Sequence, residues 1–146
     1  QKFNFEQSPT DTNTNKTISK VKIETIKKIL CIEDNIANLK LIEQLIALHP
    51  NIQLYTSLKS EHGLKFAKEI KPDLILLDIR MPKIDGYQLL SLFKQHNMLK
   101  KIPIVALSAE AKPADLFKGK QAGFSAYLTK PIDINTFNKM LKTYLT

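Results

Sequence analysis

The chain has 146 residues, of which 43% are hydrophobic and 25% charged, proportions that fit one globular domain and exclude a disordered or fibrous protein. Its formal charge of +8 comes from 22 basic and 14 acidic residues, but the basic residues are spread along the chain rather than gathered into a nucleic-acid-binding stripe. No apolar run approaches the roughly 20 residues of a transmembrane helix, and the single Cys31 excludes an internal disulfide, so we expect a soluble, cytoplasmic domain.

The N-terminal segment, residues 1–27, is predicted to be a polar linker or tail that precedes a folded domain at 28–146. Within it, the stretch 7–20 has nine Ser, Thr, Asn or Gln residues in fourteen positions. Such a stretch cannot bury enough apolar surface to offset the entropy lost on ordering. We therefore expect one domain that begins near Lys28.

Beyond Lys28, short apolar runs are bounded by Pro, Gly, Asn and Asp, which is the pattern of strands. The run LILL at 74–77 has no polar alternation, as is typical of a strand that is covered on both faces in a parallel sheet. Strands are predicted at 29–33, 52–56, 73–78, 103–107 and 124–128, with a helix after each.

The segments between these runs carry apolar residues at helical spacing, as in Ile36, Leu39 and Ile42. Residues suited to helix starts mark four of them: Asn35, Asp85 and Asp133 before the helix, and Pro113 in the first turn. Five alternations of strand and helix predict an α/β fold, a doubly wound parallel sheet with helices on both faces. Ligands of such sheets bind beyond the carboxyl ends of the strands, so function is expected at that edge.

Five polar residues follow or end the predicted strands: Glu33, Asp34, Asp78, Ser108 and Lys130. Three carboxylates at one edge repel one another unless a cation neutralises them. Oxygen ligands without His or Cys select Mg²⁺ over zinc. The edge therefore predicts a Mg²⁺ site.

A lysine and a hydroxyl at the same edge would contact an anion, and phosphoryl transfer requires mainly positioning and charge neutralisation. Asp78 is the candidate nucleophile. Each residue alone has a plainer explanation: Glu33 and Asp34 could start a helix, Ser108 could sit in a turn, and Lys130 could be solvated. Their conjunction at four strand ends favours the phosphoryl site.

Four motifs resemble the response-regulator receiver domains of two-component signalling, the CheY-like family. They are ILCIEDN, LILLDIRMPKIDGYQLL, IPIVALSAEA and GFSAYLTKPI, and the resemblance extends over about residues 28–146. It implies a flavodoxin-like (βα)5 fold with strand order 2-1-3-4-5. Two positions depart mildly from the family pattern: Glu33 stands where Asp is common, and Ser108 stands where Thr is common.

The resemblance also implies a role for each site residue. Asp78 would be the phosphoacceptor, Ser108 and Lys130 would contact the phosphoryl group, Ser108 and Tyr127 would form the switch, and the bond before Pro131 would be cis. The implied Mg²⁺ ligands are Glu33, Asp34, Asp78 and the backbone carbonyl of Arg80.

As a receiver, the chain would take a phosphoryl group from phosphohistidine on a histidine kinase domain and pass it to a histidine phosphotransfer protein. It would catalyse only its own phosphorylation and dephosphorylation. Phosphorylation would switch the face formed by the strands at 103–107 and 124–128 and the helix between them. A homodimer through that helix, the last strand and the last helix is also expected.

The motif KFNFE at 2–6 resembles the last strand of a kinase ATP-binding domain, and the chain ends directly after the last predicted helix. We therefore expect the C-terminal receiver of a hybrid sensor histidine kinase, whose parent could be membrane-anchored, with a stand-alone single-domain response regulator as the alternative. A Mg²⁺-dependent aspartyl phosphatase is disfavoured, because the sequence pattern of those enzymes has a second Asp at the position where this chain has Arg80. An FMN carrier would need a phosphate-binding loop after the first strand, where this chain has EDNIANLK.

Overall fold

The structure, a computed structural model, describes residues 25–146. The predicted linker at 7–20 and the KFNFE motif lie outside the described residues. No helix in the described part of the chain is long and apolar enough to span a bilayer.

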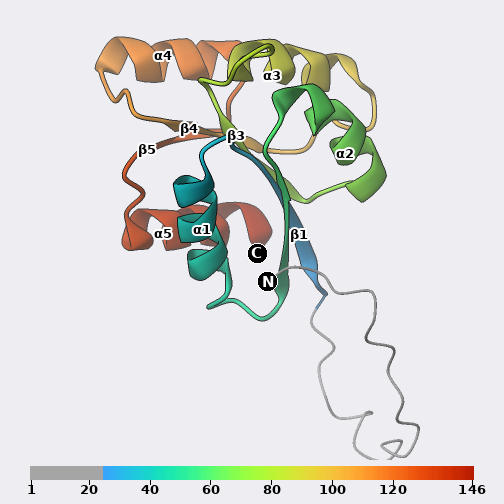
Figure 1. Cartoon of the computed structure of the whole chain (residues 1–146), viewed down its shortest axis with the longest axis vertical. Coiled ribbons are helices and arrows are strands. Elements are labelled where there is room, and N and C mark those ends of the chain that lie inside the picture. The colour runs from blue at the N-terminus through green and yellow to red at the C-terminus, as the bar shows by residue number, and fades with distance from the viewer. Residues whose placement is uncertain (1–24) are drawn as a thin grey trace, which may run out of the picture.

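Strands and helices alternate along the described chain (Figure 1). The strands are β1 (Lys27–Ile32), β2 (Ile52–Ser57), β3 (Leu74–Asp78), β4 (Ile104–Ser108) and β5 (Ala126–Thr129). The helices are α1 (Ile36–Ile46), α2 (Gly63–Ile70), α3 (Gly86–Gln95), α4 (Pro113–Ala122) and α5 (Ile134–Leu145), and a short 3-10 helix, η2 (Ser60–His62), precedes α2.

The five strands form one parallel sheet in the order β2-β1-β3-β4-β5. This confirms the predicted flavodoxin-like (βα)5 fold and its strand order. Because the order reverses between β1 and β3, the helices after these strands diverge to opposite faces and leave a crevice at the carboxyl edge. The predicted site residues of β1 and β3 therefore lie at the reversal point of the sheet.

Helices cover both faces of the sheet, α1 and α5 on one and α2, α3 and α4 on the other (Figure 1). Each face of the sheet has its own hydrophobic core, and alternate residues of a strand point into one or the other. In β1, Ile29 and Cys31 pack with α1 and α5, whereas Leu30 and Ile32 pack with α2 and α3. All four side chains are fully buried. Two-sided cover explains why the strands read as continuous apolar runs.

Side chains cap three of the helices that the sequence predicted. Asn35 accepts the N–H of Asn38 at the start of α1, and Asp133 accepts that of Thr136 at the start of α5. Asp85 forms a reciprocal capping box with Gln88 at the start of α3. These caps satisfy backbone donors that have no partner within the helix.

The last strand begins at Ala126, two residues later than its predicted range of 124–128. Helix α4 ends on Gly123 in the left-handed conformation, with φ of 116°. The N–H of Phe124 then bonds the carbonyl of Gly119. Phe124 therefore belongs to the helix end rather than to the strand, although its apolar side chain is buried as a strand residue would be.

Candidate phosphorylation and metal site

Strand register places the acidic residues of β1 and β3 side by side. Ile32 pairs with Leu77 in the parallel ladder, so Glu33 and Asp78, the next residues along the two strands, stand level at the carboxyl edge. Asp34 follows in the turn that leads to the α1 cap at Asn35. The fold thus brings together residues that are 45 positions apart in the sequence.

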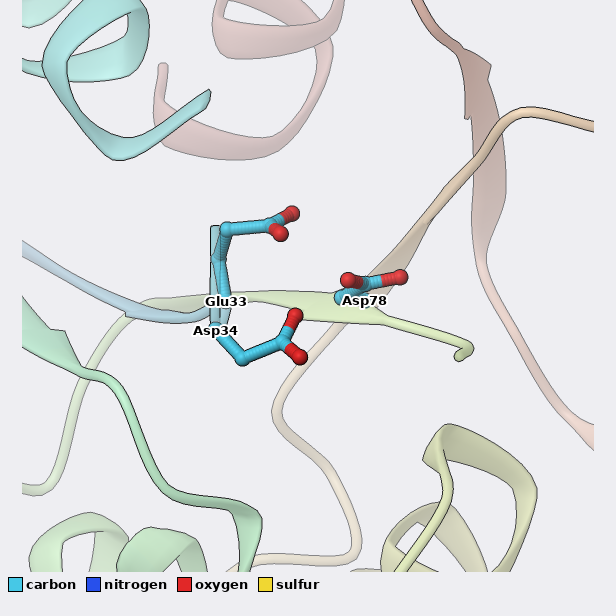
Figure 2. Close-up of side chains that lie close together, drawn as sticks. All are labelled: Glu33, Asp34 and Asp78. Atoms are coloured by element: carbon cyan, nitrogen blue, oxygen red, sulfur yellow. The ribbon is translucent and has the colours of Figure 1, made fainter. Parts of the chain in front are cut away.

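The three carboxylates point into one space between β1 and β3 (Figure 2). One oxygen each of Glu33, Asp34 and Asp78 lies within 4.8 Å of the other two. Glu33 and Asp78 are buried, with 0% and 4% of their surface exposed, whereas Asp34 is open to solvent. Because Asp34 is exposed to solvent, a cation can reach the two buried carboxylates from water.

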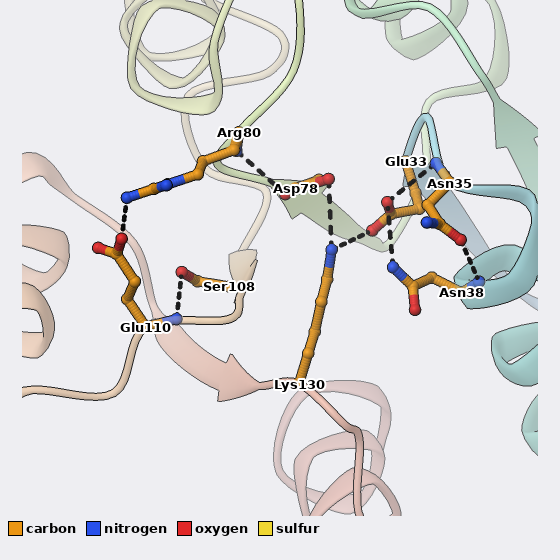
Figure 3. A network of polar contacts seen from close by, with 8 residues as sticks. All are labelled: Glu33, Asn35, Asn38, Asp78, Arg80, Ser108, Glu110 and Lys130. Atoms are coloured by element: carbon orange, nitrogen blue, oxygen red, sulfur yellow. Dashed lines mark hydrogen bonds and ion pairs between the residues drawn. The ribbon is translucent and has the colours of Figure 1, made fainter.

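Glu33 is held by the first turn of α1. Its Oε1 accepts the backbone N–H of Asn35 at 3.1 Å and the side-chain amide of Asn38 at 3.4 Å (Figure 3). Its Oε2 is fully buried and has no hydrogen bond, although the ammonium of Lys130 lies 2.9 Å away as an ion pair. The glutamate is thus fixed through one oxygen, and the other faces the acidic cluster.

Lys130 reaches the cluster from the end of β5. Its Nζ lies 2.9 Å from Glu33 Oε2 and 3.3 Å from Asp78 Oδ2 (Figure 3). Burial lowers the pKa of Lys130, but its contacts with Glu33 and Asp78 outweigh that effect and raise the pKa above its ordinary value. The lysine is therefore charged at neutral pH and offsets one of the negative charges.

Asp78 remains under electrostatic strain despite this lysine. Burial, and then the neighbouring carboxylate of Glu33, raise the pKa of Asp78 to about 7, while Lys130 and the N–H of Arg80 act in the opposite direction. That N–H donates to Asp78 Oδ1 at 3.0 Å. One ammonium thus compensates only part of the charge of the cluster, as expected of a site that takes a further cation.

The chemistry of this cluster fits Mg²⁺. Three carboxylate oxygens within 4.8 Å of one another, without His or Cys, are ligands for a hard cation. The buried Glu33 Oε2 makes no hydrogen bond and is contacted by the Lys130 ammonium at 2.9 Å, so a cation would supply a second partner for it. Glu33, Asp34 and Asp78 are the side chains that could hold the ion.

Ser108 and Tyr127, the predicted switch residues, line one cavity of about 480 Å³ beside the site. Ser108 ends β4, and its Oγ accepts the N–H of Glu110 at 3.1 Å. The hydroxyl proton therefore remains available for another acceptor. Tyr127 lies in β5 against the close backbone of Gly119 in α4, where a Cβ would be 3.0 Å from its ring.

Arg80 directs its backbone and its side chain to different partners. The N–H bonds Asp78, whereas the exposed guanidinium pairs with Glu110 (Figure 3), and both residues line the cavity. The Lys130–Pro131 peptide bond is cis, as the sequence resemblance implied.

Sequence reasoning overlooked three residues around the site. Asn38 contacts Glu33, Glu110 pairs with Arg80, and Ser60 bonds the loop after Asp78. The position of Asn38, one turn into the helix that starts at the functional edge, was a usable signal. Ser60 offered none, because a serine in a polar connection is indistinguishable from an ordinary turn residue.

Comparison with known proteins identifies the class of this domain. The family described as the response regulator receiver domain matches residues 29–142. The chain therefore belongs to the response regulator receiver domain family, whose members act in two-component systems with histidine kinases and phosphotransfer proteins.

Individual relatives are similar over nearly their whole length. The chain is 34% identical to the polar-differentiation response regulator DivK of Brucella anthropi over 122 residues, which are 82% of this chain and 96% of DivK. Among solved structures, the receiver domain of the Pseudomonas aeruginosa sensor histidine kinase PA1611, with a magnesium ion coordinated in its active-site cleft, superposes with a TM-score of 0.74. It is 28% identical, and the match covers 82% of this chain and 98% of that one.

The chemotaxis protein CheY4 of Vibrio cholerae shares the fold at a TM-score of 0.76. It is 24% identical, and the match covers 83% of this chain and all of CheY4.

Proposed function

We propose that this domain is the phosphoacceptor of a two-component phosphorelay and that Asp78 takes a phosphoryl group from phosphohistidine in a Mg²⁺-dependent step. The observation that carries the proposal is the meeting of Glu33, Asp34 and Asp78 within 4.8 Å, with the ammonium of Lys130 against two of them. Phosphoryl transfer needs little more than this positioning and charge neutralisation.

Asp78 would act as the nucleophile through a carboxylate oxygen. The new O–P bond forms as the N–P bond of the donor breaks, and the imidazole nitrogen leaves with the electron pair. Mg²⁺, when bound, neutralises charge on the carboxylates and the incoming phosphoryl group. Glu33, Asp34 and Asp78 would hold it together with the backbone carbonyl of Arg80.

Lys130 and Ser108 would stabilise the aspartyl phosphate. Lys130 is charged and already lies 3.3 Å from Asp78 Oδ2, so it can pair with a phosphoryl oxygen. Ser108 has a free hydroxyl proton to donate. Drawing Ser108 toward the phosphoryl group would let Tyr127 move within the cavity that the two residues share, and this would switch the β4-α4-β5 face.

The direct test is incubation with Mg²⁺ and a small phosphodonor, followed by intact mass measurement. We expect an adduct of one phosphoryl group on the wild type and none on Asp78→Asn. Asp133→Asn is the matched control, because Asn caps a helix as well as Asp does, and it should be phosphorylated as the wild type is. An adduct that persists in Asp78→Asn would refute the proposal, and steady hydrolysis of the donor without an adduct would favour an aspartyl phosphatase.

For the parent protein, two architectures are proposed with equal weight. The match to nearly all of DivK supports a stand-alone response regulator, and the likeness to the receiver of kinase PA1611 supports a hybrid sensor histidine kinase. Both place the domain in the cytoplasm, where the kinase domain and a phosphotransfer protein would be its partners. An antibody to the domain, applied to a blot of the source cells, separates the two by the mass of the band.

A homodimer through the α4-β5-α5 surface is a further part of the proposal. Leu116 and Phe117, which are adjacent in α4, are 40% and 66% exposed, so they would supply apolar contact area on this surface. Sedimentation before and after phosphorylation tests it, with Phe117→Ala expected to weaken any dimer.

A further inference from the structure

The loop of residues 79–86, which joins β3 to α3 and includes the first residue of α3, leads directly out of the phosphoacceptor and carries Arg80. Its two ends are drawn together, because the N–H of Gly86 bonds the carbonyl of Ile79 at 2.8 Å. A Cβ at Gly86 would lie 2.6 Å from Ile79 Cα and 2.7 Å from the Asp78 carbonyl oxygen, so only glycine allows this closure. The base of the loop is therefore fixed by the backbone itself.

The tip of the loop is in an unfavourable conformation. Lys83 has a φ of 67°, a left-handed conformation that non-glycine residues seldom adopt and that persists only where the surroundings enforce it. Within the loop, the N–H of Ile84 bonds the carbonyl of Pro82 at 2.8 Å. This bond spans only the tip itself, so the strained conformation needs further support from outside the loop.

The support comes from η2. The Oγ of Ser60, which is 2% exposed, donates to the same Pro82 carbonyl at 3.0 Å. Glu61 also pairs with Lys83 at 3.3 Å, but the Lys83 side chain is 73% exposed, and such surface pairs contribute little. The buried hydroxyl of Ser60 is therefore the stronger of the two contacts that η2 makes with the tip.

We propose that Ser60 is a positioning residue for the Mg²⁺ site: its hydroxyl holds the 79–86 loop in the conformation that keeps the backbone of Arg80 beside Asp78. The inference rests on the proposed function, because it assumes that this backbone faces the cation. It extends that function by adding a residue that touches none of the acidic side chains in the described contacts. Removing the bond should loosen the tip and lower the affinity for Mg²⁺.

Ser57→Ala provides a matched control. Ser57 is also buried, at 5% exposure, lies three residues earlier, and donates to a backbone carbonyl, that of Lys59 at 3.0 Å. Its bond is local to the connection after β2 and does not reach the 79–86 loop. Ser57→Ala and Ser60→Ala each remove one buried serine hydroxyl, the first at the end of β2 and the second at the start of η2, but only the second frees the loop.

The experiment measures Mg²⁺ affinity by calorimetry, and amide hydrogen exchange in metal-free protein, for the wild type and both variants. We expect Ser60→Ala to weaken Mg²⁺ binding about tenfold, as loss of a supporting contact around a metal site does, and to speed exchange of the Ile84 and Gly86 amides. Ser57→Ala should change neither. Adding Lys83→Gly to Ser60→Ala relieves the strained φ and should restore part of the affinity.

The outcomes separate the two claims. Wild-type affinity in Ser60→Ala, with Mg²⁺ binding lost in Asp78→Asn, would overturn this inference and leave the proposed function intact. Equal weakening by Ser57→Ala and Ser60→Ala would also overturn it, because general destabilisation would then be the cause. A wild type that binds no Mg²⁺ would overturn the proposed function and the inference with it. If Ser60→Ala fails to fold, Ser60→Thr, which retains the hydroxyl, should keep wild-type affinity, and a tenfold loss there would overturn the inference.

Discussion

The inner residues of β1 and β3 and the residues that directly follow them are buried almost equally, but with opposite energetic consequences. Ile29–Ile32 and Leu74–Leu77 are fully buried and apolar, so burial stabilises them. The next residue along each strand, Glu33 or Asp78, is 0% or 4% exposed and carries a carboxylate, whose burial is unfavourable. The buried apolar residues of the sheet interior thus stabilise the fold, whereas the buried carboxylates at its edge destabilise it.

The largest expected effect comes from a substitution in the apolar interior of the sheet. Leu76→Ala removes a fully buried side chain that packs in the core between the sheet and α1 and α5. We expect it to lower the free energy of unfolding by about 4 kcal/mol, measured by urea denaturation in metal-free buffer. Leu92→Ala, at a position that is 37% exposed, is the control and should have little effect. A loss below 1 kcal/mol for Leu76→Ala would contradict the assignment of this strand to the core.

Removal of the Lys130 ammonium from the charged edge of the sheet should have the next largest effect. Lys130→Met keeps an unbranched side chain but withdraws the ammonium from Glu33 and Asp78, which then face each other without compensation. We expect a loss of about 3 kcal/mol at pH 8, since breaking a buried ion pair leaves a buried charge behind. The loss should shrink at pH 5, because Asp78 then takes up a proton. Equal losses at the two pH values would show that packing of the lysine stem dominates.

Removal of a carboxylate should have the opposite sign. Asp78→Asn takes one charge from the cluster, while Lys130 keeps its partner Glu33 at 2.9 Å. We expect metal-free Asp78→Asn to be more stable than the wild type by about 2 kcal/mol at pH 8, within the range seen when unfavourable buried charges are replaced. Urea denaturation at several pH values measures the difference.

The pH dependence of that gain follows from the raised pKa of Asp78. The pKa is about 7 in the folded protein, against an ordinary value of 3.8, so the folded state binds the proton more tightly. The wild type therefore loses stability as the pH rises from 3.8 to about 7, and the loss is constant above that. The advantage of Asp78→Asn should be absent near pH 3.8 and complete above pH 7. A gain that is independent of pH would contradict electrostatic strain as its cause.

The sequence predicted much of both regions for the same physical reason. Runs such as LILL indicate a strand that is covered on both faces, and in a parallel sheet the residue that ends or follows such a run lies at the carboxyl edge. Glu33 and Asp78 could therefore be placed side by side before any contact was known. The roles assigned to Ser108, Lys130, Tyr127 and Arg80 remain predictions.

Other features depend on contacts that no local pattern encodes. The β5 boundary was misplaced because Phe124 is apolar but is bonded into the end of α4. Ile36, predicted from its spacing to share the apolar face of its helix, is 59% exposed, and the buried face of α1 begins at Leu39. The bond from Ser60 to Pro82 joins residues 22 positions apart, so only the packed structure could reveal it.

The smallest expected effect is that of Mg²⁺ binding, which should make the cluster of buried carboxylates stabilise the fold. At a Mg²⁺ concentration ten times Kd, binding should raise the free energy of unfolding by about 1.4 kcal/mol. The gain at a fixed Mg²⁺ concentration should be larger at pH 8 than at pH 5, because a protonated Asp78 competes with the cation for the same oxygens. Chelation should reverse it, and Glu33→Gln, which keeps the shape but removes a charge, should reduce it. Equal stabilisation of wild type and Glu33→Gln would place the ion elsewhere on the molecule, and the charged edge would then lack the partner that its buried carboxylates require.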